Sequence, residues 1–306
     1  MEKLRIGKRN IAITNGGNII FPKSGFSKYD LIEYYLNIAP FMLSHTKNRP
    51  LTMQRFVQGV EKEGFYQKNA ADYFPSWIKT IPIEKKEDGA VNYVVCNDDA
   101  TLIYLVNQLV ITFHVWLSKI NKLSNPDKMI FDLDPSVKGF AEVRFAARHL
   151  KKVLEDELGL ATFLMTTGSR GVHVVVSLDC KADFDFVRQF ARDVANLLVE
   201  RHSKKLTTQV RKVKRGKKVF IDYLRNAFAQ TGVAPYSVRA KRGAPVATPI
   251  DWAELGRVQA DTFTIKTIFK RLARKTCPWK NFLKQRCSLK RARKLLDELL
   301  EDEGIE

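Results

Sequence analysis

Apolar residues follow two different periods along this chain, and together they predict helices that alternate with short strands. Over residues 28–43 the apolar side chains recur every three to four positions, and the same spacing returns over residues 141–158 and 183–201. A shorter helix is expected over residues 99–109. Short apolar runs bounded by turn residues predict strands at 50–56, 91–96, 111–117, 128–135, 160–166, 172–178, 219–224 and 234–239.

Turn-forming and charged segments separate these elements. Asn15-Gly-Gly predicts a hairpin turn, and residues 59–72 predict a loop that holds Phe65, Tyr66 and Lys68. The alternative for this loop is a strand that buries its aromatic side chains. Elsewhere the pattern predicts a charged turn at 84–89, an irregular connection at 243–249, two basic amphipathic helices within 262–296 and an acidic tail at 297–306.

The predicted strands are short and their connections irregular, which indicates an α+β or α/β fold. We expect a mixed or mainly antiparallel central sheet flanked by helices, and not a doubly wound parallel sheet. The chain contains neither G-x-G-x-x-G nor G-x-x-x-x-G-K-[ST], which argues against dinucleotide and P-loop sites.

The net charge of the chain indicates more about its partners than its overall composition does. Lys and Arg number 52 against 33 Asp and Glu, a formal net charge of +19. Such an excess predicts a polyanionic partner, nucleic acid before acidic membrane, although a generic solubilising charge is the alternative. Two segments without acids, residues 204–218 with eight Lys or Arg and residues 262–296 with twelve, fit a surface that faces nucleic acid.

Several other classes of protein are disfavoured. The four cysteines are widely spaced and form no C-x-x-C pair, so neither a zinc site nor a disulfide framework is expected. The chain begins without a secretory signal and has no run of about 18 apolar residues, so we expect a cytoplasmic, nucleoid-associated protein without a membrane partner.

Lys128-Met-Ile-Phe-Asp-Leu-Asp-Pro135 is the segment with the clearest chemistry, because a strand here ends in Asp132 and Asp134. Side chains two apart on a strand share a face, with Cα atoms roughly 6.6 Å apart. Two carboxylates about 5 Å apart repel by about 3 kcal/mol at an effective dielectric near 20. A divalent cation such as Mg²⁺ or Mn²⁺ turns that repulsion into coordination. The alternative is a capped strand end with two solvated carboxylates.

Two more segments complete a candidate site. Thr167-Gly-Ser-Arg-Gly-Val-His173 predicts a turn whose backbone N–H groups cradle an anion, with Ser169, Arg170 and His173 as further donors. Phe220-Ile-Asp-Tyr-Leu-Arg-Asn226 carries Asp222, a third possible cation ligand, followed by Arg225. Carboxylates for two cations and cationic groups for pyrophosphate are the parts that two-metal phosphoryl transfer needs. A lone His114 between apolar residues is, on local sequence, typical of a core group.

The segments FDLDP, TTGSRGVHVVV and IDYLRNAFAQTGVAPYSVRAKRGAPVATPI closely resemble the archaeo-eukaryotic primase superfamily, and above all the polymerase domain of bacterial ligase D, the end-joining repair ligase. The resemblance spans about residues 10–280 and includes KYDLIEYY, RPLTMQRF, GFYQK and FHVW. It implies a single primase-polymerase domain, with an N-terminal αβ subregion at about 1–125, a catalytic RRM-like subregion at about 126–260 and basic helices at 261–306.

The resemblance also implies roles for individual residues. Asp132, Asp134 and Asp222 match the catalytic metal triad that holds two Mn²⁺ or Mg²⁺ ions. Nucleotide binding is implied for His114, which would lie near the incoming sugar, and for Thr167, Gly168, Ser169, Arg170, His173, Lys218, Arg225, Gln230 and Arg239. DNA binding is implied for Lys28, in a pocket for a 5′-phosphate, for Phe65 and Tyr66, which would pack against the template, and for Arg55 and Lys68.

The function implied is a template-directed nucleotidyltransferase that adds NTPs or dNTPs to a 3′-OH at DNA gaps or broken ends, with the end-binding protein Ku and a separate ligase as candidate partners. Asn18 departs from the pattern, because a second phosphate-pocket lysine is common there, so 5′-phosphate recognition is expected to be weaker. The sequence contains no ligase or nuclease region. We therefore expect either a stand-alone polymerase domain or a domain cut from a longer protein. The alternatives are a non-catalytic DNA-end-bridging module and a primase that starts chains without a primer.

Overall fold

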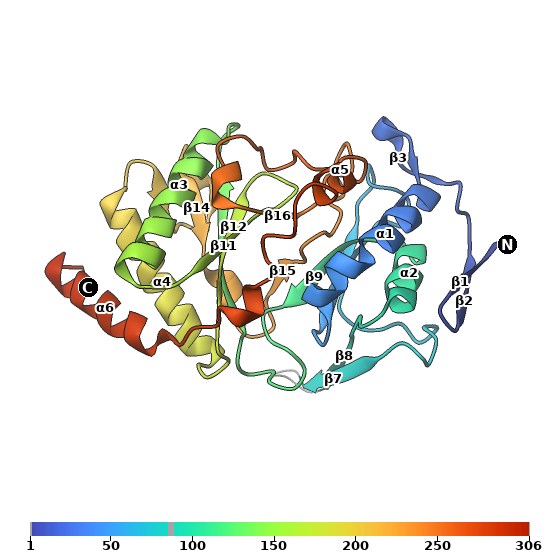
Figure 1. Cartoon of the computed structure of the whole chain (residues 1–306), viewed down its shortest axis with the longest axis horizontal. Coiled ribbons are helices and arrows are strands. Elements are labelled where there is room, and N and C mark those ends of the chain that lie inside the picture. The colour runs from blue at the N-terminus through green and yellow to red at the C-terminus, as the bar shows by residue number, and fades with distance from the viewer. Residues whose placement is uncertain (1, 85–88, 306) are drawn as a thin grey trace. The chain divides into compact units, whose positions relative to one another are not determined.

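A computed structural model describes residues 2–84 and 89–305 of the chain (Figure 1). Its α-helices are α1 (Lys28–Thr46), α2 (Asp99–Asn107), α3 (Ala141–Lys152), α4 (Phe184–Arg201), α5 (Ile268–Leu272) and α6 (Leu289–Asp302). Its strands are β1 (Glu2–Ile6), β2 (Arg9–Ile13), β3 (Ile19–Phe21), β4 (Phe26–Ser27), β5 (Leu51–Arg55), β6 (Phe65–Gln67), β7 (Thr80–Glu84), β8 (Ala90–Val94), β9 (Val110–Trp116), β10 (Lys128–Pro135), β11 (Thr162–Thr166), β12 (Val172–Ser177), β13 (Leu206–Thr207), β14 (Val219–Asp222), β15 (Thr231–Val233) and β16 (Thr248–Ile250).

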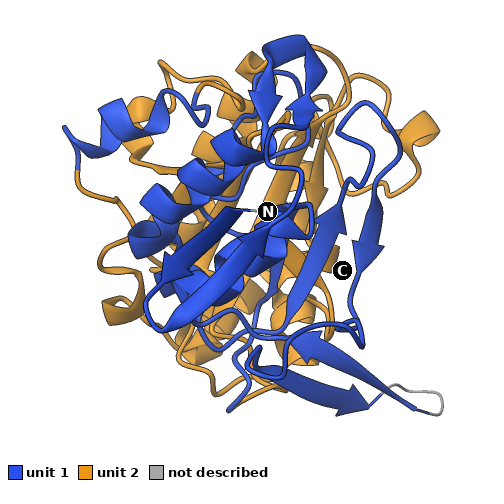
Figure 2. Cartoon of the chain, turned by 90° about the vertical axis from the view of Figure 1, so that its right-hand side faces the viewer, with its two compact units in different colours: residues 1–121, 233–248, 263–275 blue, residues 122–232, 249–262, 276–306 orange. Residues whose placement is uncertain are grey.

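The chain forms two compact units whose segments interleave along the sequence (Figure 2). Unit 1 comprises Met1–Asn121, Val233–Thr248 and Phe263–Lys275, and the remaining segments form unit 2. The single domain with three consecutive subregions stays a prediction from the family resemblance.

Unit 1 is organised by helix α1 and strand β9. Ser27 begins α1 with a capping box, because its hydroxyl accepts from the backbone N–H of Asp30 while the Asp30 carboxylate accepts from the backbone N–H of Ser27. Tyr35 packs α1 against β9: its hydroxyl donates to the carbonyl of Ile111 at 2.7 Å, and its ring lies 5.3 Å from that of Phe113. Strand β9 belongs to a four-stranded sheet of order β15-β9-β5-β6.

Unit 2 contains a six-stranded sheet of order β13-β14-β10-β12-β11-β16, against which α3 and α4 pack. Strand β10 pairs antiparallel with β12 and with β14, whereas β13 and β14 are parallel. This mixed sheet with flanking helices confirms the predicted α+β class. Phe131 and Leu133 of β10 are fully buried. Because side chains alternate along a strand, Asp132 and Asp134 occupy the other face.

Two turn and strand predictions were wrong. The N-terminal hairpin closes between Ile6 and Arg9, not at Asn15-Gly-Gly, which instead forms a turn before β3. Residues 234–239 were expected to form a strand, but the regular pairing is confined to β15 just before them. Pro235 has no N–H to donate, and Tyr236 has a φ of 67°, so the backbone turns away from a strand here.

Three segments differ from the prediction in extent. The first basic helix of residues 262–296 is reduced to the five residues of α5. Pro278, which cannot continue a helix, lies in the segment between α5 and α6. The second, α6, runs on into the expected acidic tail as far as Asp302. The predicted loop at 59–72 contains strand β6, yet Phe65 and Tyr66 are 47% and 58% exposed, so the strand does not bury its aromatics.

The turn expected at 84–89 lies largely outside the described residues. Among the described helices, none combines the length and the apolar character needed to cross a membrane.

Candidate active site

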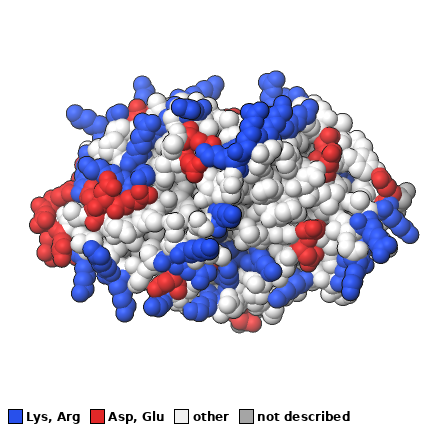
Figure 3. Space-filling model, viewed as in Figure 1, with Lys and Arg blue, Asp and Glu red and all other residues white. Residues whose placement is uncertain are grey.

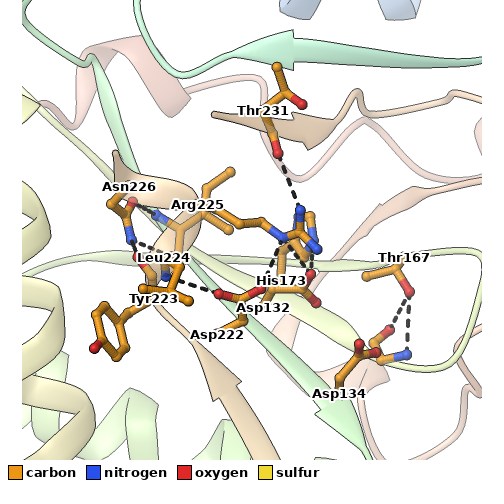
Figure 4. Close-up of polar contacts among 12 residues, drawn as sticks. Asp132, Asp134, Thr167, His173, Asp222, Tyr223, Leu224, Arg225, Asn226 and Thr231 are labelled. Carbon is orange, nitrogen blue, oxygen red and sulfur yellow. Dashed lines mark hydrogen bonds and ion pairs between the residues drawn. The ribbon is translucent and has the colours of Figure 1, made fainter. Parts of the chain in front are cut away.

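Strands β10 and β14 bring three carboxylates to one face of the sheet in unit 2 (Figure 4). Asp132 and Asp134 share that face because they are two residues apart on β10. Asp222 is the direct register partner of Asp132 across the antiparallel β10–β14 pair, so its side chain points to the same face. Like charges directly opposite each other destabilise a sheet, so this arrangement needs a compensating cation.

In the protein alone, Arg225 supplies that positive charge. Its Nε donates to Asp132 Oδ2 at 2.7 Å and lies 3.7 Å from Asp222 Oδ2. Its Nη1 also donates to the carbonyl of Thr231 at 3.4 Å, which fixes the guanidinium in place. His173, the register partner of Asp132 on β12, brings its Nε2 within 3.5 Å of Asp132 Oδ2.

The three carboxyl groups respond differently to this environment. Burial alone would raise the pKa of Asp132, but the charges of His173 and Arg225 outweigh it and hold that pKa well below its usual range. Burial and the neighbouring charge of Asp132 raise the pKa of Asp134, although Arg170 lies 3.7 Å from it. Burial also raises the pKa of Asp222 against the opposing pull of Arg225. Opposed shifts within one cluster are typical of functional sites.

The turn between β11 and β12 closes on itself beside the carboxylates. The backbone N–H and the hydroxyl of Thr167 both donate to the carbonyl of Gly171 at 3.0 Å. A Cβ on Gly171 would lie 1.9 Å from the carbonyl oxygen of Leu133, so only glycine lets the turn lie this close to β10. Gly168 has a φ of 64°, a left-handed conformation that glycine adopts freely. The turn therefore holds its Gly171 backbone against Leu133 and Asp134 of β10.

Asn226 is a positioning residue that the sequence prediction missed. Its buried side chain accepts from the backbone N–H of Ile130 at 2.8 Å and donates to the Ile130 carbonyl at 2.7 Å. This pair of hydrogen bonds to β10, two residues before Asp132, fixes the turn that carries Arg225. An asparagine just after a strand ending in aspartate was the available signal, but its partner lies far away in sequence. Gly171 is a second residue of this kind: it lies in the predicted Thr167–His173 turn, but no role was predicted for it.

The three carboxylates are the right kind of ligand for a divalent cation, but they are not arranged as a complete metal site. In residues 2–84 and 89–305, no group of three or more His, Cys, Asp and Glu side chains forms a ready-made metal site. Instead, the Arg225 guanidinium is bonded to Asp132 and lies close to Asp222. Asp132 Oδ1 is buried and has no hydrogen-bond partner among the described residues. A buried, unsatisfied carboxylate oxygen beside two further carboxylates is a fitting ligand for Mg²⁺ or Mn²⁺.

Two other nucleotide-binding residues were predicted in unit 2, Lys218 and Gln230. Lys218 precedes β14 and Gln230 precedes β15. Within the described chain, no hydrogen bond or ion pair joins either side chain to the three carboxylates. Figure 3 shows Lys and Arg side chains over much of the visible face, with acidic side chains gathered where α6 lies.

His114 and Arg239, also predicted to bind nucleotide, belong to unit 1. His114 is buried on β9 opposite Thr52 of β5, and its ring lies 5.6 Å from that of Tyr66. Arg239 is half-buried, and its backbone N–H donates to the carbonyl of Pro245 at 2.7 Å.

A pocket in unit 1, about 460 Å³ in volume, contains the predicted 5′-phosphate lysine and the position that departs from the family pattern. Lys28, Asn18 and Arg55 all line it. Lys28 is buried, and its Nζ donates to the carbonyl of Asn107 at 2.9 Å and to the hydroxyl of Thr14 at 3.3 Å. Burial lowers the pKa of Lys28.

Comparison with known proteins identifies relatives over nearly the whole chain. The family model described as LigD, primase-polymerase domain, matches residues 27–279. The bifunctional non-homologous end joining protein LigD of Bacillus subtilis is 32% identical over 275 residues, which cover 89% of this chain and 44% of the relative. The multifunctional LigD of Mycobacterium bovis is 30% identical over 277 residues, covering 87% and 36%. The chain thus spans less than half the length of these curated relatives.

A solved structure agrees with these matches. The polymerase domain of Mycobacterium tuberculosis ligase D, in complex with DNA, is 27% identical and superposes with a TM-score of 0.84 over 90% of this chain and 99% of that one. The resemblance seen in the sequence motifs is confirmed, and the chain belongs to the LigD primase-polymerase domain family.

Proposed function

We propose that this protein is a metal-dependent, template-directed nucleotidyltransferase that adds NTPs or dNTPs to a 3′-OH at DNA gaps or broken ends during non-homologous end joining. The observation that carries the proposal is the direct pairing of Asp132 with Asp222, on the same face as Asp134 and beside the Thr167–Gly171 turn. Membership of the LigD primase-polymerase family supports it.

Asp132, Asp134 and Asp222 would hold two divalent cations, Mn²⁺ or Mg²⁺. When bound, such ions lower the pKa of a primer hydroxyl and stabilise the oxygens of leaving pyrophosphate. The residues around them bind the triphosphate: the backbone and hydroxyl of Ser169, the guanidinium of Arg170 and the imidazole of His173 are donors suited to phosphate oxygens.

Arg225 has two functions in this proposal. It neutralises Asp132 and Asp222 in the protein alone, through contacts of 2.7 and 3.7 Å. Beside a bound nucleotide, the same guanidinium is a donor for phosphate oxygens. The nucleotide-binding roles of His114, Lys218, Gln230 and Arg239 stay predictions from the family resemblance.

The substrate we propose is gapped or broken DNA, with a 5′-phosphate bound in the pocket around Lys28. The relatives' names assign those proteins to non-homologous end joining, which supports repair of DNA breaks as the setting, with Ku and a separate ligase as partners and the nucleoid as location. The net charge of +19 fits a protein that contacts several phosphates.

Primer extension on gapped DNA tests the catalytic proposal. Wild-type protein should extend a labelled primer with Mn²⁺ or Mg²⁺ and release pyrophosphate, and EDTA should stop the reaction. Asp132→Asn, Asp134→Asn and Asp222→Asn should each abolish extension while DNA affinity stays within about twofold, because the carboxylates are needed for cation binding and not for DNA docking. Asp185→Asn, a change at an exposed position of α4, is the matched control and should keep full activity.

Each alternative has its own signature in this assay. A non-catalytic end-bridging module would bind the DNA without extension under any cation, and activity in the three carboxylate variants would remove the mechanism. A primase would make products from template and NTPs without a primer.

A further inference from the structure

Phe65 and Tyr66, expected to act as a pair, lie on opposite faces of strand β6. In the β5–β6 pairing, Phe65 is opposite Arg55 and Tyr66 is opposite Gln54. Because side chains alternate along a strand, the two rings point apart. Tyr66 packs 5.6 Å from His114, whereas the Phe65 ring lies 5.6 Å from the guanidinium carbon of Arg55. The two aromatics therefore belong to different surfaces of unit 1.

The surface with Phe65 contains a second exposed ring, that of Tyr73. Phe65 is 47% exposed and Tyr73 is 59% exposed. Both are tied to Arg55, whose Nη1 donates to the Tyr73 hydroxyl at 3.0 Å and to the Gln67 side chain at 2.7 Å. The Nε of Arg55 also donates to the carbonyl of Gln108 at 2.9 Å. Three hydrogen bonds fix the guanidinium between the two rings.

Tyr73 stays exposed although the loop that carries it is anchored to the rest of unit 1. The neighbouring Phe74 anchors this segment to α2, because its ring lies 5.5 Å from that of Tyr104. The Tyr73 ring contacts Phe74 at 5.2 Å but stays mostly in solvent. A single exposed aromatic is common on protein surfaces. Two exposed aromatics joined through one immobilised arginine form a platform with flat faces and one positive charge.

We propose that Tyr73, with Phe65 and Arg55, forms a stacking site for unpaired bases of single-stranded DNA. The proposal rests on the proposed function, since the DNA at a gap or resected end exposes such bases. Aromatic faces and arginine planes stack on any base, and this is the chemistry of sequence-independent single-strand binding. Arg55 supplies the positive charge of this platform, and the two rings supply the stacking surface.

Substitutions of Tyr73 separate stacking from other roles. The assay is fluorescence anisotropy of a duplex with an unpaired template segment, compared with a blunt duplex. Tyr73→Phe keeps the ring and should bind the single-stranded segment within about twofold of wild type. Tyr73→Leu keeps apolar packing without an aromatic face and should bind at least about fivefold more weakly, with blunt-duplex affinity unchanged. Phe186→Leu on α4, where Phe186 is 39% exposed, is the matched control and should have no effect.

Two further measurements protect the conclusion from a folding artefact. In wild-type protein, 5-iodouracil in the unpaired segment should photo-crosslink to Tyr73, and the same base placed in duplex should not. The slope of log affinity against log salt should be the same for Tyr73→Leu and wild type, because a stacking residue releases no counterions. Lys68→Ala provides the contrast: if Lys68 contacts a phosphate, this variant reduces the single-strand slope by about 0.7.

Equal binding by the Leu and Phe variants, an equal loss on blunt duplex, or crosslinks that avoid Tyr73 would each overturn the stacking site. The polymerase proposal is tested independently of this site. It fails if wild-type protein does not extend a primer on gapped DNA with Mn²⁺ or Mg²⁺, whatever the result for single-strand binding.

Discussion

Asp132 of β10 and Asp222 of β14 are direct register partners in an antiparallel pair, and the same guanidinium of Arg225 lies within 3.7 Å of both carboxylates. The protein thus holds two like charges at a spacing that a sheet would otherwise avoid. In the protein alone an arginine compensates for them, and in the proposed reaction divalent cations would do so. This relationship and the residues around it lead to the first three predictions, and the pocket of Lys28 leads to the fourth.

The first prediction is that two of the proposed catalytic carboxylates reduce stability. Burial raises the pKa of Asp134 and of Asp222, so their ionised forms are disfavoured in the fold. Asp134→Asn and Asp222→Asn should each raise the free energy of unfolding at pH 7 by about 0.5 to 1 kcal/mol in EDTA. Urea titration measures this, and Asp132→Asn should have the opposite sign because it removes the charge that His173 and Arg225 stabilise.

The raised pKa values of Asp134 and Asp222 also determine how the stability of the fold depends on pH. A carboxyl whose folded pKa is raised stabilises the fold fully below its unfolded pKa of about 4, and that stability is lost as pH rises through the folded pKa. Wild-type protein should therefore lose stability from these two groups above about pH 4. The Asp134→Asn/Asp222→Asn double variant should lack this component. An identical pH profile in both proteins would contradict the assigned shifts.

The second prediction concerns Arg225 and cation binding. Arg225→Gln leaves three carboxylates without their guanidinium, so the apoprotein should lose roughly 1 to 3 kcal/mol of unfolding free energy. Mn²⁺ should then raise the melting temperature of Arg225→Gln by more than it raises that of wild type, because the ion replaces the missing charge. Arg170→Gln, at a position whose side chain is 51% exposed, is the control with a smaller effect. Equal Mn²⁺ shifts in wild type and Arg225→Gln would argue against a cation site at these carboxylates.

The third prediction is that Gly171→Ala disrupts the turn next to Asp134. The new Cβ would lie 1.9 Å from the Leu133 carbonyl oxygen, and backbone on both sides must shift. We expect a loss of about 1 to 3 kcal/mol in stability together with a raised KM for nucleotide. Gly17→Ala is the matched control, since no atom of the described residues lies within 4 Å of a Cβ there. A Gly171→Ala protein with normal stability and KM would show that close approach to β10 is dispensable.

The fourth prediction concerns a second lysine introduced into the pocket of Lys28. Asn18 lines this pocket together with Lys28. Asn18→Lys should increase the preference for a gap with a 5′-phosphate over one with a 5′-hydroxyl by about three- to tenfold, as one added charge-assisted hydrogen bond allows. Competition binding between the two DNAs measures the ratio. An unchanged ratio would mean that the pocket does not bind the 5′-phosphate through position 18.

Local elements were predicted well where neighbouring residues contain the signal. Asp98 and Asp183 begin α2 and α4 by accepting from backbone N–H groups three residues ahead, as expected from their types. The hairpin predicted at Asn15-Gly-Gly was wrong because the N-terminal hairpin closes at Gly7-Lys8 instead. The position of that turn follows from the pairing of β1 with β2, which the local sequence does not show. Residues 234–239 misled because apolar content alone does not report the positive φ of Tyr236.

The sequence by itself determined that Asp132 and Asp134 share a face, since alternation along one strand is a local property of the backbone. It also contained the motifs that identify the family. Only the tertiary structure decided that Asp222 is the partner of Asp132, that Asn226 bonds to Ile130 and that Tyr73 joins Phe65 at Arg55. These relations link residues distant in sequence, and they depend on how strands pair and pack when the cores are buried, which no local period records.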